Sequence, residues 1–268
     1  MSAPAPWDPD TASRRVVFWR HGRTEWNRAG RFQGQQDIAL DADGLRQAAE
    51  AAAVLRFLEP DAIVSSDLRR ALGTGQALAA ETGLDVAEDK RLRETFAGTW
   101  EGRTFTQIAE QDAPLLAAWS AGVGSARAGG GETRVDVGRR VAEAVGEAVL
   151  ELPAGGTLVA VSHGGAIRAG ICALLGLPTE SWAVISGVSN CHWSVLQEIP
   201  DRHGNPAWHL AQHNVGLDSL PSGPVEGSQA VPGCPSGERC VDFALLLICT
   251  KVEELLRSGE RKSEANNL

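Results

Sequence analysis

The chain has 268 residues, of which 43% are apolar and 22% charged, and its net charge is −9 at pH 7. This length can bury one substantial core, or a core with an appendage. The acidic balance argues against a general nucleic-acid or anionic-membrane binder, because such surfaces need clustered Lys and Arg. An anionic substrate would therefore have to be attracted by a local cationic pocket.

Residues 1–14 are expected to form a flexible N-terminus. They are rich in Ala and Pro with acidic residues, and they lack the basic start and apolar core of a secretory signal. No stretch of the chain reaches the roughly 18 apolar residues that span a bilayer. We therefore expect a cytoplasmic protein that has no membrane partner.

Residues 15–19 predict a buried strand, and this strand ends abruptly in Arg20-His21-Gly22. A histidine held between guanidinium groups would stay neutral and nucleophilic near pH 7, because neighbouring positive charge disfavours imidazolium. The arginines themselves can hold phosphate oxygens by paired hydrogen bonds. An isolated histidine would more often be structural, so this interpretation depends on matching residues later in the chain.

Alternating helices and strands are predicted for the rest of the chain up to residue 217. Helices are expected over 43–58, which Pro60 stops, over 67–83 with Asp67 as N-cap, over 134–150, and from 165 to about 176. Strands are expected at 62–65, 85–87, 157–161, 182–188, 191–199 and 207–213. This order predicts an α/β fold with three layers, in which a doubly wound, mostly parallel sheet carries helices on both faces.

Ligands of such sheets bind beyond the carboxyl ends of the strands. Arg20 and His21, the segment that holds Arg70, and His163 each follow one of the predicted strands. Glu94 lies in a loop after the short strand at 85–87. The strand pattern alone therefore predicts that these residues share one site.

The run from Arg20 to Thr24 (Arg-His-Gly-Arg-Thr), followed by Asn27, resembles the signature of the histidine phosphatase superfamily. This superfamily includes the cofactor-dependent phosphoglycerate mutases. Three further segments, at 65–71, 92–94 and 162–165, agree with the family in order and spacing. The resemblance covers residues 15–217 and implies a phosphoglycerate mutase-like fold for that domain.

The resemblance implies a two-step phosphoryl transfer through a phosphohistidine. His21 would attack the phosphorus, and Arg20, Arg70 and His163 would hold the phosphate, with His163 protonated or donating a hydrogen bond. Glu94 would protonate the leaving oxygen and then deprotonate the attacking water. No cofactor is expected. A metal-free mechanism is expected because no His/Asp/Glu cluster outside the proposed pocket has metal-ligand spacing.

The rest of the substrate would be recognised by loops around the phosphate site. Asn27 is expected to donate to a phosphate oxygen or to hold the loop after His21. The candidate substrate rim comprises Arg23, Arg31, Gln33, Gly34, Gln35 and the region 100–106. The loops at 31–37, 65–71, 91–95 and 130–136 also resemble a narrower family, the actinobacterial glucosyl-3-phosphoglycerate phosphatases. Such a substrate needs a cation for its carboxylate, for which Arg31 is the candidate, and polar groups for its sugar.

Three other functions stay open at this point. A phosphoglycerate mutase would share the phosphohistidine, but its family members carry a longer segment over the site than residues 95–162 provide, and an open site favours water as the acceptor. A broad-specificity acid phosphatase is the second alternative. A catalytically idle binding module is the third, and the complete set of Arg20, His21, Arg70, Glu94 and His163 argues against it.

The C-terminal part has a different character. Residues 218–240 are rich in Pro, Gly and Ser and predict a flexible linker. Residues 241–268 predict a helical tail whose apolar side would dock on the main domain or on a second copy of the chain, and docking on a second copy would give a homo-oligomer. The simpler alternative is an extension without a role in catalysis. The five cysteines predict no disulfide framework, with Cys172 and Cys191 as reduced core residues.

Overall fold

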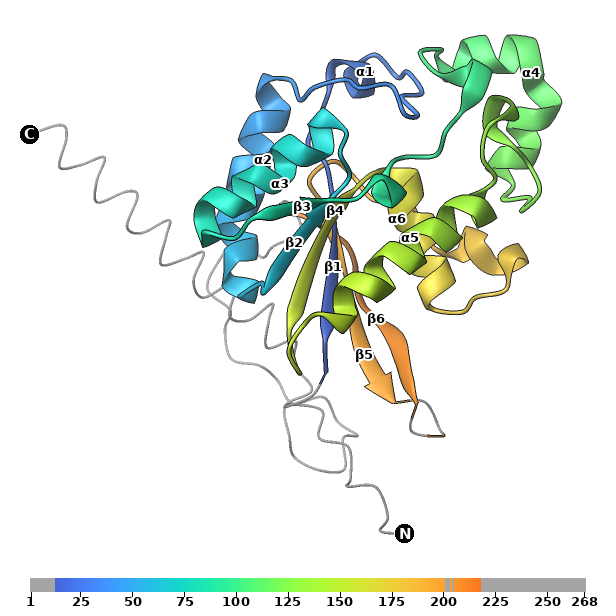
Figure 1. Ribbon diagram of the computed structural model, residues 1–268. Coiled ribbons are helices and arrows are strands. Elements are labelled where there is room, and N and C mark those ends of the chain that lie inside the picture. The colour runs from blue at the N-terminus through green and yellow to red at the C-terminus, as the bar shows by residue number, and fades with distance from the viewer. Residues whose placement is uncertain (1–12, 201–202, 204, 218–268) are drawn as a thin grey trace, which may run out of the picture. The chain divides into compact units, whose positions relative to one another are not determined.

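The computed structural model describes residues 13–200, 203 and 205–217 (Figure 1). The predicted linker at 218–240 and tail at 241–268 lie outside these residues, as does most of the predicted N-terminal segment 1–14. The described part contains a six-stranded sheet with the strand order β3-β2-β4-β1-β5-β6. The strands are β1 Arg15–Arg20, β2 Ala62–Ser65, β3 Val86–Glu88, β4 Thr157–Ser162, β5 Trp193–Pro200 and β6 Pro206–Val215.

The first four strands run parallel to one another, while β5 pairs antiparallel with β1 and β6 antiparallel with β5. The centre of the sheet is buried on both faces, which is why its strands are continuous apolar runs. All six residues of β4 are buried, and so are the four central residues of β1. The edge strand β6 is partly exposed along its length.

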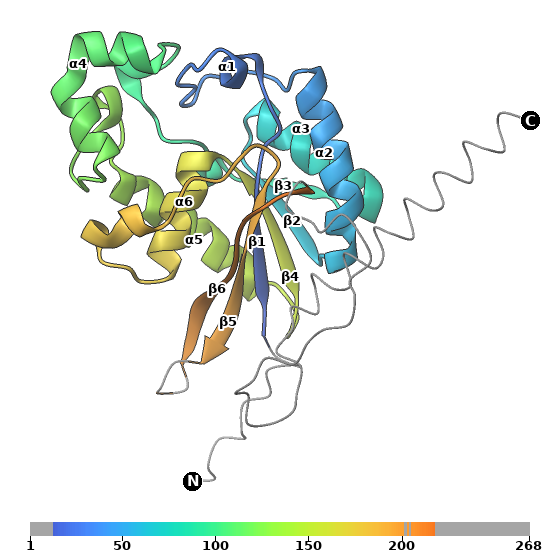
Figure 2. The ribbon, with the colours of Figure 1, turned by 180° about the vertical axis from the view of Figure 1, so that it is seen from behind.

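Helices cover both faces of this sheet (Figures 1 and 2). The covering helices are α2 Ala42–Leu55 and α3 Arg69–Thr82 on one face, and α5 Arg134–Leu150 and α6 Gly164–Leu174 on the other; α1 Glu25–Arg28 and α4 Phe105–Ser120 lie elsewhere. Val16 and Phe18 of β1 join one core cluster with α5 and α6. Successive side chains of a strand point to opposite faces, so Val17 and Trp19 lie on the face covered by α2 and α3. The predicted three-layer, mostly parallel α/β architecture is confirmed.

Helices α1 and α4 lie beyond the end of the sheet at which the parallel strands finish (Figure 1). The sequence analysis did not predict α4. Thr104 caps this helix by accepting from the backbone N–H of Gln107 at 3.2 Å. Pro114 inside the helix masks the pattern, and the backbone of Asp112 leaves the helical region two residues before it.

Two of the predicted helix boundaries differ from those in the structure. The helix at 43–58 begins at Ala42 and ends at Leu55, after which residues 56–58 form a single 3-10 turn. Asp67 does not cap the next helix, which begins at Arg69 after Leu68. The Asp67 carboxylate instead accepts from Arg93 Nε at 2.6 Å and Nη2 at 2.5 Å.

The strand predicted at 182–188 is also wrong. Residues 179–184 form a 3-10 helix, which is followed by a loop. Trp182 is buried there and donates from its indole nitrogen to the Leu177 carbonyl at 3.0 Å. One buried aromatic residue among small and apolar residues resembles strand alternation in sequence, although no ladder forms.

The remaining strand and helix predictions agree with the structure within a few residues. On α5 the buried face carries Val137, Val141, Val145 and Val149, whereas Val135 is 39% exposed. Cys172 and Cys191 are buried free thiols, as predicted. Cys234, Cys240 and Cys249 lie outside the described residues.

Candidate active site

The segments that follow β1, β2 and β4 lie side by side at the carboxyl ends of these strands. Arg20 and Ser162 are register partners, so the next residues, His21 and His163, lie side by side with ring centroids 5.1 Å apart. Ser66 follows β2 and donates its backbone N–H to the Val161 carbonyl at 2.9 Å. The structure thus gathers Arg20, His21 and His163 from strand ends that the sequence separates by up to 143 positions.

The hydrogen bonds of His21 determine which of its ring nitrogens is free. Its Nδ1 lies 2.7 Å from the Gly22 carbonyl oxygen, which can only accept, so Nδ1 carries the proton and Nε2 keeps its lone pair. The residue is only 2% exposed. Burial, followed by the charges of Arg70 and Arg20, holds the pKa of His21 well below its usual value. His21 is therefore a neutral imidazole with a free Nε2 at pH 7.

Arg70 is fully buried in the first turn of α3. It donates from Nε to His163 Nδ1 at 3.1 Å, from Nη1 to the Gln36 carbonyl at 2.7 Å, and from Nη2 to the Gly34 carbonyl at 2.8 Å. These bonds engage three of its five N–H groups and leave two for a ligand. Burial lowers its pKa to about 10, which still leaves the guanidinium charged at pH 7.

His163 is the N-cap residue of α6 and is fully buried. Its Nδ1 accepts from Arg70, so Nε2 carries the proton and donates to Ser66 Oγ at 2.9 Å. Burial and the neighbouring charges of Arg70, His21, Arg20 and Arg140 hold the pKa of His163 well below its usual value. His163 is therefore a neutral imidazole whose single N–H is directed to Ser66, whereas the sequence analysis expected His163 to hold the phosphate.

The Glu94 carboxylate is held by two backbone N–H groups. Thr95 N donates to Oε1 at 2.8 Å, and Gly165 N, at the start of α6, donates to Oε2 at 3.0 Å. A Cβ atom at residue 165 would lie 2.6 Å from Glu94 Oε1. Glycine is therefore required there for the close approach of the carboxylate to the positive end of α6.

Arg140 of α5 fixes the backbone that carries Glu94. Its Nη1 donates to the carbonyls of Arg91 and Arg93 at 2.6 Å each, and its Nη2 donates to the Glu94 carbonyl at 2.9 Å. The same guanidinium pairs with Glu132 through Nε at 2.8 Å and Nη2 at 2.9 Å. The sequence analysis did not identify Arg140, because the three carbonyls that it binds lie 46 to 49 residues away and no local pattern marks them.

Glu132 also joins the two ends of the α4 segment. Its backbone N–H donates to the Phe96 carbonyl at 2.9 Å, and its Oε2 accepts from the Phe96 N–H at 2.8 Å. The segment that contains α4 therefore begins at residue 96 and ends beside the same point at residue 132.

Arg20 lies above the first residue of α6. A Cβ atom on Gly164 would be 3.3 Å from the Arg20 Cζ atom. Arg20 donates from Nη1 to the Val188 carbonyl at 2.6 Å, while its buried Nε has no partner within the described part of the chain. Burial lowers its pKa. Its remaining N–H groups are available to a ligand between Arg20 and Arg70.

The carboxamide oxygen of Asn27 and the guanidinium group of Arg23 are both engaged within the fold. Asn27 Oδ1 accepts from the Thr24 backbone N–H at 3.2 Å in a capping box, and Asn190 Nδ2 donates to it at 3.3 Å. Asn27 thus holds the loop after His21, which is one of the two roles expected for it. Arg23 donates from Nε to Asp41 at 2.9 Å and pairs with Asp43, so its charge is neutralised at the start of α2.

The rim candidates from the next loop are also engaged in the fold. Arg31 is exposed and donates to the Gly102 carbonyl at 2.6 Å. Gln33 is buried and accepts from Thr24 Oγ1 at 3.0 Å. Gly34 has a φ of +51° and presents its carbonyl to Arg70. These residues shape the wall behind Arg70, and only Arg31 is at the surface.

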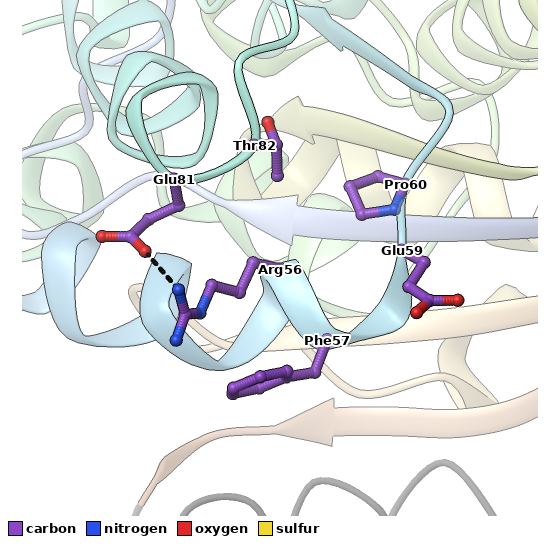
Figure 3. A pocket seen from close by; sticks show the side chains of 6 residues that line it. All are labelled: Arg56, Phe57, Glu59, Pro60, Glu81 and Thr82. Carbon is purple, nitrogen blue, oxygen red and sulfur yellow. Dashed lines mark ion pairs between the residues drawn. The ribbon is translucent and has the colours of Figure 1, made fainter. Parts of the chain in front are cut away.

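A surface hollow elsewhere is separate from this site (Figure 3). It is lined by Arg56, Phe57, Glu59, Pro60, Glu81 and Thr82. It lies at the C-terminal ends of α2 and α3, whose opposite ends carry Gly44 and Arg70. Each helix has 14 residues, which corresponds to about 20 Å of helix between the hollow and the site.

Two further observations concern the described residues alone. They contain no group of three or more His, Cys, Asp or Glu side chains placed to hold a metal ion. Within the same residues, no helix is both long enough and apolar enough to cross a membrane.

The chain belongs to the histidine phosphatase superfamily (branch 1), whose family model matches residues 16–215, and it is an enzyme of the phosphatase class. This confirms the family predicted from the motifs. Glucosyl-3-phosphoglycerate phosphatase of Mycolicibacterium vanbaalenii is 42% identical over 199 residues, which are 72% of this chain and 88% of that protein. The protein of the same name from Mycobacterium tuberculosis is 44% identical over 192 residues, which are 69% and 85% of the two chains.

Two other comparisons extend this picture. A probable phosphoglycerate mutase of Yersinia pestis is 38% identical over 166 residues, 62% of this chain and 77% of that protein. The solved structure of mycobacterial glucosyl-3-phosphoglycerate phosphatase in complex with VO3 superposes with a TM-score of 0.71 at 41% identity. That match covers 76% of this chain and 100% of the solved one.

Proposed function

We propose that this enzyme hydrolyses glucosyl-3-phosphoglycerate, a small phosphorylated metabolite, through a phosphohistidine on His21. The observation that carries the proposal is the state of His21: a neutral imidazole with a free Nε2, buried beside Arg20 and Arg70. The choice of substrate is supported by relatives named glucosyl-3-phosphoglycerate phosphatase, which are 42–44% identical to this chain.

In the first step, the lone pair of His21 Nε2 forms the N–P bond while the ester P–O bond breaks. The free N–H groups of Arg20 and Arg70 stabilise the charge on the equatorial oxygens of the transferring group. The bond from Arg70 Nε to His163, continued to Ser66, fixes the orientation of the Arg70 guanidinium. The leaving alkoxide takes a proton from Glu94.

In the second step, Glu94 removes a proton from a water molecule, and the water oxygen attacks phosphorus on the side opposite His21. The N–P bond breaks, inorganic phosphate leaves, and His21 returns to its neutral form. Because Glu94 is anchored by the N–H groups of Thr95 and Gly165, the same carboxyl group is in place for both proton transfers.

We also propose that the reaction takes place in the cytoplasm. The free, buried Cys172 and Cys191 fit a reducing compartment. Self-association through residues 241–268 stays a prediction, because that segment lies outside the described residues.

The test is metal-free phosphate release from a panel of esters, with glucosyl-3-phosphoglycerate, 3-phosphoglycerate, mannosyl-3-phosphoglycerate and p-nitrophenyl phosphate as members. We expect preference for the glucosyl ester and loss of release in His21→Ala. With 32P-labelled ester, quenching in alkaline detergent, in which a phosphohistidine is stable, should trap 32P on the wild-type protein and none on the variant. Slow release from every ester would favour a broad-specificity phosphatase. Appearance of 2-phosphoglycerate without free phosphate would overturn the hydrolase proposal in favour of a mutase.

A further inference from the structure

Arg134 and Arg168 are two partly buried arginines that form no ion pair with any acidic residue of the described ranges. Arg134 is the first residue of α5, and Arg168 lies in the second turn of α6. The Nε atom of each is buried and, within the described part of the chain, has no hydrogen-bond partner. Neighbouring arginines differ from this pair: Arg127 and Arg139 both pair with Asp136.

The two side chains are held in place without being neutralised. The Arg134 guanidinium stacks on the Trp119 ring, with Cζ 4.1 Å from the ring centre, and donates to the Trp119 carbonyl at 2.8 Å. Arg168 donates from Nη2 to the Trp182 carbonyl at 3.1 Å. Each guanidinium has five N–H groups, so most of its donors are still available.

The pair lies next to the acid/base carboxyl group. Gly165 touches Glu94, and Arg168 is three residues further along α6, on the same face of the helix and about one turn away. Burial lowers the pKa of Arg134 to about 10, and the charge of Arg168 adds to this effect while that of Glu94 opposes it. Arg134, Arg168 and Glu94 are therefore close enough to interact electrostatically.

Glu94 also shows which part of a substrate would meet this pair. In the proposed mechanism the phosphate lies between His21, Arg20 and Arg70, and Glu94 protonates the leaving oxygen. Residues on the side of Glu94 away from the phosphate therefore face the alcohol portion of the ester. Two adjacent guanidinium groups repel each other and are costly to hold together without an anion, and they match the planar geometry of a carboxylate.

We propose that Arg134 and Arg168 bind a carboxylate on the alcohol portion of the substrate. The inference rests on the proposed function and deepens it: the substrate class is a phosphomonoester with a carboxylate close to the ester, and these residues select it. The proposal gives Arg134 and Arg168 the role that the sequence analysis expected of Arg31, which lies at the surface and donates to Gly102.

The test uses two esters that differ in one group. 3-Phosphoglycerate carries a carboxylate where glycerol 3-phosphate carries a hydroxymethyl group. In Arg134→Met and Arg168→Met, we expect kcat/KM for 3-phosphoglycerate to fall at least about tenfold further than kcat/KM for glycerol 3-phosphate, the loss expected for a charged hydrogen bond. Arg134→Lys should recover part of the discrimination. Arg139→Met removes the same charge from an exposed position of α5 and should leave the ratio unchanged.

Binding gives the same comparison without turnover. In the unreactive His21→Ala protein, the ratio of the two dissociation constants should show the carboxylate preference, and Arg134→Met in that background should remove it. Equal losses for both esters, or an unchanged ratio, would assign the pair a structural role and overturn the inference. A preference in binding without phosphate release from any ester by the wild-type enzyme would instead refute the proposed function and leave the carboxylate site standing.

Discussion

Replacing Arg140 by Met should separate the positioning of Glu94 from the rest of the chemistry. The side chain is only 16% exposed, and it donates to three carbonyls of residues 91–94 and to both oxygens of Glu132. Loss of one partner of a largely buried ion pair costs about 3–5 kcal/mol. We therefore expect the free energy of unfolding to fall by about that amount.

The catalytic effect follows from the released backbone. A displacement of about 1 Å in a reacting group costs on the order of a hundredfold in rate. The loss should depend on the leaving group, because an alkoxide needs a proton from Glu94 whereas p-nitrophenolate departs without one. We expect kcat/KM, which reports formation of the phosphohistidine, to fall about a hundredfold for an alkyl phosphate and much less for p-nitrophenyl phosphate.

The assay is steady-state phosphate release at a temperature where each variant is folded, checked by circular dichroism. Arg139→Met is the matched control, since Arg139 is the neighbouring residue on α5 and is 72% exposed. Arg140→Lys keeps a charge and provides a more stable protein if the Met variant unfolds. Adding Glu132→Gln to Arg140→Met should restore stability without restoring alkyl phosphate hydrolysis. Equal losses of kcat/KM for both leaving groups would refute a role of Arg140 through Glu94.

Three further predictions concern the centre of the site. Gly165→Ala places a Cβ 2.6 Å from Glu94 Oε1, so kcat/KM for an alkyl phosphate should fall at least about tenfold with a smaller change for p-nitrophenyl phosphate; an unchanged kcat/KM for both would contradict the anchoring of Glu94 at α6. Arg70→Met removes the buried clamp and should lower kcat about 10²–10³-fold, with weaker inhibition by vanadate measured alongside, whereas a variant of near wild-type rate would exclude Arg70 from the phosphate site. The pKa values of His21 and His163 are lower in the folded protein than in the unfolded chain, so the unfolded chain binds more protons as the pH falls. The free energy of unfolding should therefore decrease as the pH drops through about 6.5, by up to about 1.4 kcal/mol per pH unit for each histidine. Urea unfolding of the wild-type protein and of His163→Asn between pH 7.5 and 5.5 checks this, because the variant should show a weaker dependence of the unfolding free energy on pH. The same dependence in both proteins would mean that His163 is not held neutral.

The sequence predicts the parts of this fold that carry a local signal. β1 and β4 are buried on both faces, so their apolar runs are continuous and bounded, and Arg20, His21 and His163 follow directly from where those runs end. Parallel pairing then brings the strand ends to one edge of the sheet. The order of the motifs was enough to place Arg70 and Glu94 in the same region.

The interactions that the sequence could not predict connect residues distant in the chain. Asp67 resembles an N-cap, yet Arg93, 26 residues later, takes its carboxylate. Arg23 resembles a substrate contact, yet Asp41 and Asp43 neutralise it. Neither pairing has a fixed spacing or a periodic pattern, because both depend on which loops the sheet brings together.

The closure of the chain at Phe96 and Glu132 makes the α4 segment an exchangeable unit. Glu94 lies before this junction and is fixed from α5 and α6, whereas residues 101–103 bind the loop at 31–36 whose carbonyls hold Arg70. The entropic cost of closing a loop grows only slowly with its length. Cassettes of different length and composition could therefore be joined between residues 104 and 132 to alter the approach to the substrate while the phosphoryl-transfer centre is kept.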